Sequence, residues 1–334
     1  MEANITNIKE YSSGEPFLSV YPDYDLNTLP KWILDNLNDA RVVGKSKQTI
    51  ILPDSRKYHL NNKLNNLTGS EWTYFINSIV NTRYKTTGSD SYAYATRKIH
   101  PSPKPPQLMR DIIMFFTKEK ELVFDCFMGV GGTLLGAALC NRKAAGIDLN
   151  SSYIAAYKEA AKELDLPRFD TMSGDAINIL SNSSIMNQLT GGDIISLLLL
   201  DPPYSNMMSK TKTGADMKLY GNSSTPFTDS TYDLGNMEYE DYLEKLKQSI
   251  VLALPYMKNK GHVVVFSKDM QPSKKEPNLI HADVINKINE VPGLFYKGMK
   301  IWADQTSKLF PYGYPFSFVA NQIHQYIIVF RIED

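Results

Sequence analysis

The sequence predicts an α/β fold: a doubly wound, mostly parallel, seven-stranded sheet that ends in an antiparallel hairpin. Two observations lead to this prediction. The apolar run from Leu197 to Leu200 lies between Gly191-Gly192 and Pro202-Pro203, and so short a run with such boundaries is typical of a strand buried on both faces. Further apolar runs alternate with helical apolar spacing over residues 121–290, which is the pattern of parallel strands joined by crossover helices.

The first half of the predicted sheet lies between residues 100 and 175. The proline-rich stretch 100–106 predicts an extended segment, because a residue before proline disfavours helical backbone. Helical apolar spacing follows over 107–117. We then expect strands over 121–125 and 144–149 and a third strand that ends at Gly174-Asp175, with helices over 134–141 and 151–164 between them.

The second half of the sheet is interrupted by a long polar segment. A helix over 176–185 leads to the buried strand before Asp201, and residues 205–237 are then rich in Ser, Thr, Asn, Gly and Lys. Loops of this length inside a compact domain are usually functional or mobile. We expect the remaining elements to be helices over 239–257 and 283–290 and strands over 261–266, 295–302 and 325–331.

Residues 1–95 predict an N-terminal extension to a main domain of residues 96–334. Their signals are weaker: a short helix that begins at Lys31, a strand over 48–52 and a helix over 70–80. Residues 41–118 carry thirteen Lys and Arg against four acids, whereas residues 1–40 carry seven acids against two lysines. Such clustering suits a phosphate-binding face, although charges scattered over a solvated surface would give the same count.

Composition bounds the class of protein. The chain has 334 residues, of which 43% are hydrophobic and 22% charged, and its formal net charge is zero. These values are ordinary for a soluble globular protein. No apolar run approaches the ~20 residues that span a bilayer, and the N-terminus lacks the pattern of a signal peptide. Two cysteines predict neither a disulfide framework nor a metal cluster. We therefore expect a cytoplasmic protein without a metal or membrane contact.

Polar groups follow several of the predicted strands. Gly129, Gly131 and Gly132 follow the first strand, where glycines let the chain turn tightly and bring backbone N–H groups close to a ligand. The spacing fits neither the dinucleotide fingerprint nor the P-loop. Asp148 and Asp175 stand at the ends of the next two strands. Because ligands of open α/β sheets bind beyond the carboxyl ends of the strands, we expect one crevice lined by these groups.

The tetrad from Asp201 to Tyr204 follows the fourth strand. Proline cannot donate a backbone hydrogen bond, so the tetrad offers acceptors and one aromatic ring. This combination suits a planar group that carries an NH2. A simple turn after the strand is the alternative, because Asp-Pro often begins a turn.

These motifs resemble the S-adenosylmethionine-dependent DNA amino-methyltransferases, which methylate adenine N6 or cytosine N4. The segment His100-Pro101-Ser102-Pro103-Lys104-Pro105 is similar to the family's His-Pro-Thr-x-Lys-Pro, and Asp125 to Gly131 is similar to its Asp-Pro-Phe-x-Gly-x-Gly loop, with Cys126 in place of proline. Asp201-Pro202-Pro203-Tyr204 matches its catalytic tetrad. The resemblance implies a sheet of the class I methyltransferase type.

The resemblance also implies roles for individual residues. Asp201, Pro202, Pro203 and Tyr204 would be catalytic: acceptors at Asp201 and the Pro202 carbonyl would hold the amine, and Tyr204 would stack on the base. S-adenosylmethionine would bind to Ser102, Lys104, Asp125, Cys126, Phe127, Gly129, Gly131, Thr133, Asp148, Leu149, Asp175 and Ala176. Asp148 would bind the ribose, and Asp175-Ala176 would face the adenine of the cofactor.

The implied substrate is double-stranded DNA with the target base flipped out, since the amine is unreachable inside a duplex. Within the family, Asp at the head of the tetrad favours adenine N6. Cytosine N4, an RNA amino group or a non-catalytic DNA-binding subunit are the alternatives. Residues 1–95 are a possible target-recognition element, and the loop 205–237 either contacts DNA or covers the cofactor. A cognate restriction endonuclease is a possible partner, and the oligomeric state stays open.

Overall fold

The computed structural model of the protein describes residues 9–85, 88–207, 226–269, 279–307 and 309–333. The chain forms two compact units. Unit 1 comprises Met1–Asn77 and Met114–Lys120, and unit 2 comprises Ser78–Ile113 and Glu121–Asp334. The boundary therefore falls at Asn77 rather than at residue 95, because residues 79–82 form a strand that belongs to the sheet of unit 2.

Unit 1 is built on a small antiparallel sheet in the order β1-β2-β3-β4. Its strands are β1 (Glu15–Pro16), β2 (Arg41–Val43), β3 (Thr49–Ile51) and β4 (Lys57–His59), and its helices are α2 (Phe17–Val20), α3 (Lys31–Leu34) and α4 (Gly69–Phe75), with 3-10 turns η1 (Leu26–Thr28) and η2 (Leu37–Asp39). Phe17, Ile33 and Ile50 are fully buried in the centre of its core. The unit thus has a hydrophobic core of its own.

The helix expected over 70–80 is shorter than predicted. Thr68 and Glu71 form a capping box that fixes the beginning of α4, but the helix ends at Phe75. Ile79–Thr82 instead form strand β5, which pairs in parallel with β11 (Leu294–Asp304). The four residues of β5 show no buried apolar face, so their local pattern does not predict a strand.

Acids of the first forty residues neutralise part of the basic excess that follows them. Two such ion pairs within the described part of unit 1 are Lys47–Glu15 at 2.8 Å and Lys57–Glu10 at 2.6 Å. A third pair, Arg56–Asp54 at 2.7 Å, lies within the basic stretch itself. Surface pairs of this kind contribute little stability. They do reduce the net positive charge that the sequence count alone suggests for a phosphate-binding face.

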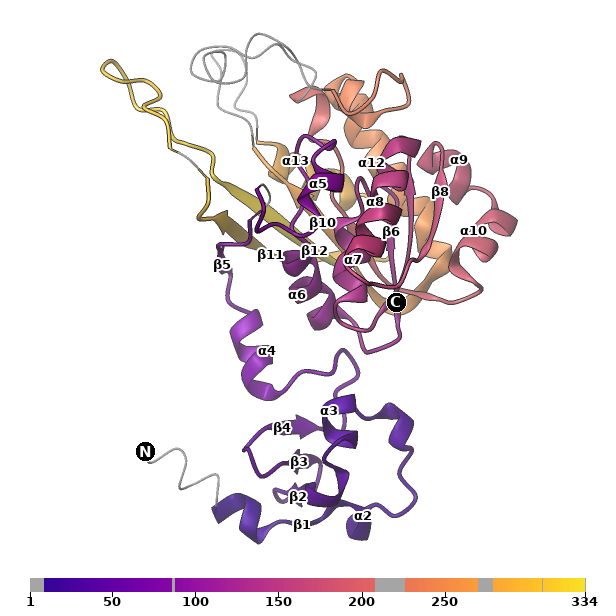
Figure 1. Ribbon diagram of the computed structural model, residues 1–334, viewed down its shortest axis with the longest axis vertical. Coiled ribbons are helices and arrows are strands. Elements are labelled where there is room, and N and C mark those ends of the chain that lie inside the picture. The colour runs from indigo at the N-terminus through magenta and orange to yellow at the C-terminus, as the bar shows by residue number, and fades with distance from the viewer. Residues whose placement is uncertain (1–8, 86–87, 208–225, 270–278, 308, 334) are drawn as a thin grey trace. The chain divides into compact units, whose positions relative to one another are not determined.

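Unit 2 contains an eight-stranded, mostly parallel sheet (Figure 1) in the order β5-β11-β12-β10-β9-β6-β7-β8. Its strands are β5 (Ile79–Thr82), β6 (Leu122–Asp125), β7 (Lys143–Asp148), β8 (Asp170–Ser173), β9 (Ile195–Leu200), β10 (Met257–Ser267), β11 (Leu294–Asp304) and β12 (His324–Ile332). Only β12 runs antiparallel to its neighbours. The predicted seven strands and their terminal hairpin are confirmed, and β5 adds an eighth at the edge.

Helices cover both faces of this sheet. They are α5 (Tyr94–Arg97), α6 (Pro106–Phe116), α7 (Gly132–Ala138), α8 (Ser151–Glu163), α9 (Ala176–Leu180), α10 (Ser183–Thr190), α12 (Tyr239–Ala253) and α13 (Ile280–Ile288), with 3-10 turns η3 (Ser205–Met207), η4 (Leu234–Asn236) and η5 (Leu254–Tyr256). The helix expected over 176–185 is two helices, because Asn182 has extended backbone and caps α10. Among the described residues, no helix has the length and apolarity needed to cross a membrane.

The core of unit 2 follows from the alternation of side chains along the strands. Phe124, Leu198 and Leu200 point to the face on which α9, α10, α12 and α13 pack. All six side chains of β9 are buried, as the uninterrupted apolar run predicts for a central strand covered on both sides. The strand order changes direction at β6, which lies between β7 and β9. Such a reversal opens a crevice at the carboxyl ends of the strands.

Gly131 fixes the junction between β6 and α7. It is the N-cap of α7 and has φ +77°, a left-handed conformation that residues with a side chain rarely adopt. A Cβ at this position would lie 2.2 Å from Cδ2 of Tyr157. The absence of a side chain therefore lets α8 pack closely against the loop.

We predict that Gly131→Ala destabilises the protein by about 2–4 kcal/mol, as the sum of the left-handed backbone and the clash with Tyr157. Gly293→Ala is the matched control, because Gly293 has φ +76° and its nearest neighbour would be 3.6 Å from the added Cβ. The control should cost only about 1–2 kcal/mol. Urea denaturation of both variants measures the difference, and equal losses would contradict the role of Tyr157.

Candidate active site

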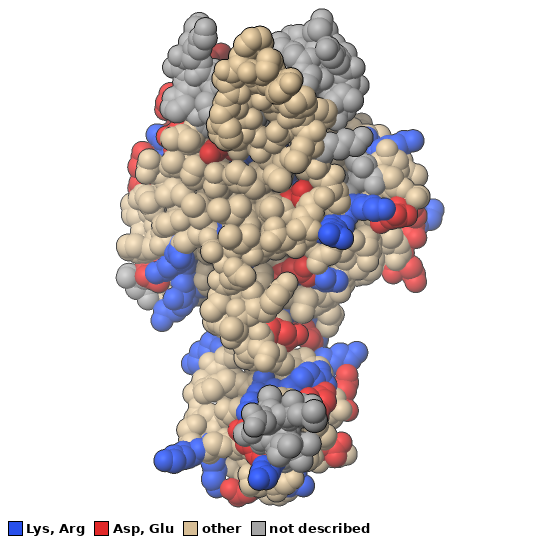
Figure 2. All heavy atoms as spheres, turned by 90° about the vertical axis from the view of Figure 1, so that its left-hand side faces the viewer, with Lys and Arg blue, Asp and Glu red and all other residues tan. Residues whose placement is uncertain are grey.

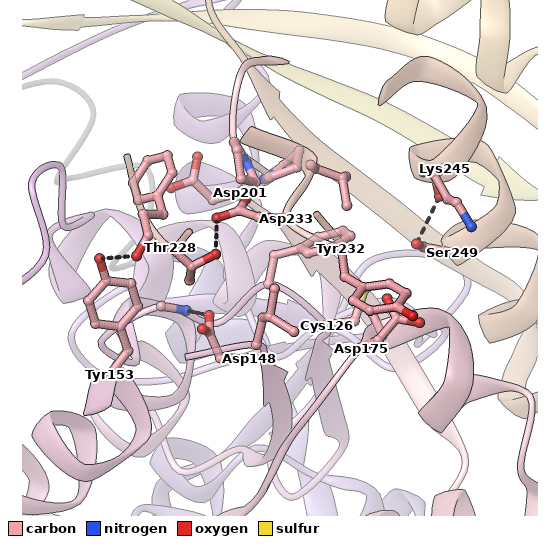
Figure 3. A pocket seen from close by; sticks show the side chains of 18 of the residues that line it. Cys126, Asp148, Tyr153, Asp175, Asp201, Thr228, Tyr232, Asp233, Lys245 and Ser249 are labelled. Carbon is pink, nitrogen blue, oxygen red and sulfur yellow. Dashed lines mark hydrogen bonds between the residues drawn. The ribbon is translucent and has the colours of Figure 1, made fainter. Parts of the chain in front are cut away.

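A cavity that is open to solvent lies at the carboxyl ends of β6, β7, β8 and β9 (Figure 3). Most of the site residues predicted from the sequence meet there. Those that line it are Ser102, Lys104, Cys126, Phe127, Gly129, Asp148, Leu149, Asp175, Ala176, Asp201, Pro202, Pro203 and Tyr204. Asp125 and Thr133 line a smaller adjoining pocket. Gly131 lines neither and acts on the backbone of the loop.

Asp125 holds the glycine loop in shape. Its Oδ1 accepts a hydrogen bond of 2.9 Å from the backbone N–H of Phe127, and its Oδ2 accepts one of 2.6 Å from the hydroxyl of Thr133. Asp125 is 1% exposed, and this burial raises its pKa to about 7. The carboxyl group thus ties β6, the loop and the beginning of α7 together.

Asp148 connects the ends of β6 and β7. Its Oδ2 accepts a hydrogen bond of 2.7 Å from the backbone N–H of Gly129, and its Oδ1 accepts one of 2.8 Å from that of Asn150. Burial raises the pKa of Asp148 to about 6. Gly129 has φ +51°, and a Cβ there would lie 3.2 Å from Nε2 of His100, so glycine leaves room for the segment that contains His100.

The adjoining lining combines a thiol, an acid and the first turn of a helix. Cys126 is 1% exposed, and burial raises the pKa of its thiol well above the ordinary value, so the side chain is neutral. Asp175 caps α9 by accepting a hydrogen bond of 3.1 Å from the backbone N–H of Asn178. Ala176 is the first residue of α9, and the first N–H groups of a helix have no partner within it.

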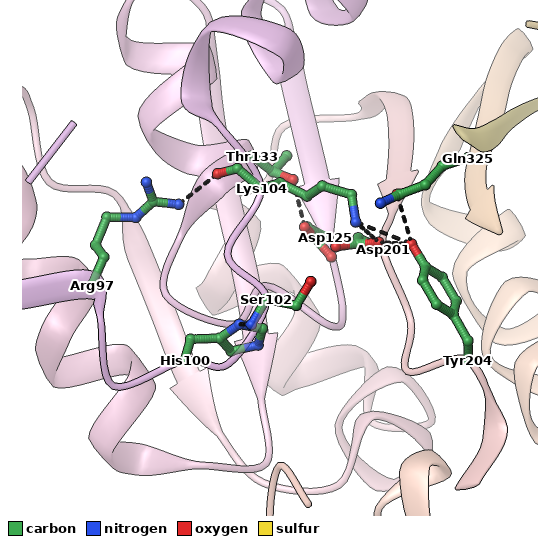
Figure 4. A network of polar contacts seen from close by, with 9 residues as sticks. All are labelled: Arg97, His100, Ser102, Lys104, Asp125, Thr133, Asp201, Tyr204 and Gln325. Atoms are coloured by element: carbon green, nitrogen blue, oxygen red, sulfur yellow. Dashed lines mark hydrogen bonds and ion pairs between the residues drawn. The ribbon is translucent and has the colours of Figure 1, made fainter. Parts of the chain in front are cut away.

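Arg97 braces the segment around Lys104 (Figure 4). The side chain is 4% exposed and donates to the backbone oxygens of Lys104 at 2.7 Å, Val130 at 3.2 Å and Tyr92 at 3.4 Å. Burial lowers its pKa to about 10, so the guanidinium remains charged near neutral pH. The sequence analysis missed this residue, because nothing in its local pattern separates it from a surface arginine.

Lys104, Asp201 and Tyr204 form one buried polar network (Figure 4). Nζ of Lys104 lies 2.7 Å from Oδ1 of Asp201 and donates at 3.0 Å to the hydroxyl of Tyr204. The hydroxyl donates at 2.8 Å to the same Oδ1 and lies 3.1 Å from Oε1 of Gln325. Burial raises the pKa of Tyr204 well above its ordinary value. The hydroxyl therefore stays protonated and orients the carboxylate.

The ring of Tyr204 is less available than we expected from the sequence. Tyr204 is 8% exposed, and its hydroxyl is held within the network. A base that stacked on this ring would find little surface in the present arrangement. Gln325, at the beginning of β12, is a further member of the site that the sequence analysis did not select.

The described end of the predicted loop 205–237 lies on the cavity. Phe227 stacks on His100 with ring centroids 5.1 Å apart, and its backbone oxygen accepts hydrogen bonds from Tyr153 at 3.2 Å and Asn150 at 3.3 Å. Burial, with the charges of Lys104 and Arg97, lowers the pKa of His100 to about 3, so the imidazole is neutral. Lys210, Lys212 and Lys218, which could contact DNA, lie outside the described residues.

The cavity carries an excess of negative charge. Asp233 is 6% exposed, and its carboxylate accepts hydrogen bonds from the hydroxyl of Thr228 at 2.7 Å and the backbone N–H of Gly235 at 2.8 Å. With Asp148, Asp175 and Asp201 it makes four carboxyl groups in the lining, against the two ammonium groups of Lys104 and Lys245. This set of acceptors suits a ligand that combines positive charge with hydroxyl and amine donors.

Comparisons with known proteins agree with this site. A family model described as DNA methylase, for the N6/N4 enzymes, matches residues 12–159. The match includes Lys104, Asp125 and Asp148 and ends before the tetrad at Asp201.

Three curated relatives are 37–40% identical over short stretches. They are the type II methyltransferase M1.MboII of Moraxella bovis (40% over 55 residues, 16% of this chain and 21% of the relative), the type II methyltransferase M.HpaI of Haemophilus parainfluenzae (37% over 68 residues, 20% and 22%) and the orphan methyltransferase M.BamHII of Bacillus amyloliquefaciens (40% over 63 residues, 19% and 24%). The chain thus matches less than a quarter of the length of each.

Solved structures with a related fold are distant. They include TrmN from Thermus thermophilus (14% identity, TM-score 0.38, 72% of this chain and 48% of that one) and NSun6 from Pyrococcus horikoshii (13% identity, TM-score 0.42, 70% and 53%). The strand order, rather than these scores, defines the fold as that of a class I methyltransferase. The family model and the curated relatives agree with the motifs. By all three, the chain is similar to the DNA amino-methyltransferases of the adenine-N6 and cytosine-N4 type.

Proposed function

We propose that the protein transfers a methyl group from S-adenosylmethionine to the N6 amino group of adenine in double-stranded DNA, with the target base flipped out of the helix. One observation carries the proposal: the acceptor-rich tetrad at the end of β9 shares a cavity with the glycine loop and Asp148. The first group suits an amine, and the second suits a nucleoside.

The residues on the β6 and β7 side fit S-adenosylmethionine. Each oxygen of Asp148 accepts one backbone hydrogen bond and has a further lone pair for a ribose hydroxyl. The N–H groups at the beginning of α9 and the carboxylate of Asp175 suit the cofactor's adenine. Ser102 and Lys104 also line the cavity, and their proposed role is to hold the methionine end. Cys126, Phe127 and Leu149 supply apolar lining. When bound, the cofactor provides an electrophilic methyl group on a positively charged sulfur.

The residues on the β9 side fit the exocyclic amine of a base. Asp201 and the carbonyl of Pro202 can each accept one N–H, which holds the nitrogen and favours a lone pair directed at the methyl group. Lys104 and Tyr204 fix the orientation of the Asp201 carboxylate. The buried hydroxyl network thus gives Tyr204 a positioning role rather than the stacking role expected from the sequence.

The choice of base rests on family analogy. Asp at the head of the tetrad favours adenine, and cytosine N4 methylation by the same residues is the alternative. An RNA amino group as substrate and a non-catalytic DNA-binding subunit are less favoured, because Asp148, Asp201 and Tyr204 are all retained in one cavity. We further propose that unit 1 helps to read the target, that the protein acts in the cytoplasm, and that a restriction endonuclease is a possible partner.

The first prediction concerns the product. With labelled S-adenosylmethionine and unmodified duplex DNA, nucleosides obtained by digestion should contain N6-methyladenine. Asp201→Ala should lower the rate by at least about a hundredfold, because it removes an acceptor that positions the amine. Tyr204→Phe keeps the ring and removes the hydroxyl that orients Asp201, so we expect a smaller loss, of about tenfold, mainly in kcat.

Mass spectrometry of the nucleosides distinguishes the outcomes. Detection of N4-methylcytosine would leave the proposed mechanism unchanged but would identify cytosine, rather than adenine, as the target base. A product on tRNA and none on any DNA would refute the DNA substrate. Full activity of Asp201→Ala would refute the proposed role of the tetrad.

The second prediction concerns pH. The carboxyl group of Asp148 has a pKa of about 6 in the ligand-free protein, whereas a ribose hydroxyl needs the ionised form as acceptor. Ligand binding must therefore displace a proton below that pH. The affinity for S-adenosylmethionine should be constant above about pH 7 and fall by up to tenfold per unit below pH 6.

Calorimetric titration between pH 5 and pH 8 measures this dependence. Asp148→Asn should weaken binding at pH 8 and flatten the profile, because the amide does not ionise. Asp170→Asn, at the exposed beginning of β8, is the matched control and should retain the profile of the wild type. An unchanged profile in Asp148→Asn would refute the role of this carboxylate.

A further inference from the structure

The connection between β11 and β12 carries a group of exposed aromatic rings. We call residues 305–323 the arm, which the structure describes except for Lys308, and we call Tyr314, Phe316 and Phe318 the aromatic tip. Their exposed fractions are 82%, 93% and 92%. Large apolar side chains exposed together usually mark a binding surface. Nothing in the proposed transfer of the methyl group uses them.

The arm is held in a defined conformation. Oδ1 of Asn321 accepts a hydrogen bond of 2.8 Å from the backbone N–H of Phe310, and its Nδ2 donates one of 2.8 Å to the backbone oxygen of the same residue. Gly313 has φ +76°, and its oxygen accepts backbone hydrogen bonds from Phe316 at 2.7 Å and Ser317 at 2.8 Å. These contacts within the arm fix the conformation of the tip. Such preorganisation favours binding.

The directions of the strands place the arm and the cavity at the same end of the sheet. β9 and β10 are parallel, β12 is antiparallel to β10, and β11 is antiparallel to β12. The carboxyl end of β11, where the arm begins, therefore lies at the same end of the sheet as the carboxyl end of β9, which leads into Asp201. The arm returns into β12, whose residue Gln325 reaches the hydroxyl of Tyr204. The arm thus projects from the same end of the sheet as the cavity (Figure 1, yellow).

The charge of the arm suits a polyanion. Residues 305–323 contain no Asp or Glu and one Lys. The projecting top of unit 2 in Figure 2 is accordingly tan where its residues are described. A protein partner would equally accept aromatic rings, but the absence of acids over nineteen residues removes repulsion from phosphates.

We propose that the aromatic tip is a wedge that stacks on the bases of duplex DNA and fills the space from which the target base has been flipped. The inference rests on the proposed function, because only a flipped base leaves such a space. Apolar side chains that insert between base steps stabilise unstacked DNA, and an aromatic ring is the side chain best suited to stack on a base.

A duplex with one abasic site tests the wedge without knowledge of the recognition sequence, because the space is already present. The full-length wild type should bind this duplex about tenfold more tightly than the intact duplex, the equivalent of one good stacking contact. The combined variant Tyr314→Ala, Phe316→Ala and Phe318→Ala should bind both duplexes equally. Fluorescence anisotropy with labelled DNA gives the two dissociation constants.

Phe295→Ala is the matched control. Phe295 is 48% exposed and lies near the beginning of β11, at the end of the strand opposite to the arm. Its removal should therefore leave the preference for the abasic duplex unchanged. Retained binding of S-adenosylmethionine by the combined variant shows that the fold is intact. No preference in the wild type, or an undiminished preference in the combined variant, would overturn the wedge.

Two further measurements separate this proposal from others. If the wild type sediments as a dimer and the combined variant as a monomer, the tip is an interface between copies and the wedge is refuted. Methyl transfer to unmodified duplex DNA is measured on the same samples. A wild type that transfers no methyl group contradicts the proposed function, while the abasic-site preference still decides the role of the tip.

Discussion

The ion pair between Lys104 and Asp201 is the contact on which the geometry of the site depends. The two side chains are 6% and 18% exposed, and the removal of such charges from water is unfavourable unless their hydrogen-bonding capacity is satisfied. The hydroxyl of Tyr204 satisfies part of it, by accepting from Lys104 and donating to Asp201. The segment before α6 and the end of β9 must therefore meet in one arrangement, and Gln325 brings the beginning of β12 to the same point.

Arg97 extends this constraint to the glycine loop. Its guanidinium holds the backbone oxygens of Lys104 and Val130, so the residue that positions Asp201 and the loop that follows β6 share one buried donor. No acid neutralises Arg97 among the contacts described, and three carbonyl groups stabilise its charge. Hydrogen bonds to a charged group are stronger than neutral ones. The two halves of the cavity are thus fixed relative to each other by backbone contacts, before any ligand binds.

Sequence reasoning located the parts of the site that follow directly from strand ends. β9 contains four consecutive leucines, and all six of its residues are buried. The strand and the tetrad after it can therefore be recognised from the local sequence. Asp148 and Asp175 could be predicted in the same way, because each comes directly after or at the end of a predicted strand. Asp233 and Phe227 reach the cavity, and Arg97 reaches the adjoining pocket, only through tertiary folding. No periodic pattern in the sequence marks these residues. Strand β5 was missed because none of its four side chains is buried and because its partner strand lies more than two hundred residues away in the sequence.

The buried acids of the site lower the stability of the ligand-free protein. Burial raises the pKa of Asp125 to about 7 and that of Asp148 to about 6, which means that ionisation of these groups opposes folding near neutral pH. Asp233 adds a further negative charge close to Asp148. A ligand with a positively charged centre and hydroxyl donors would relieve this repulsion on binding. The same carboxylates therefore lower the stability of the ligand-free protein and strengthen the binding of a cationic nucleoside.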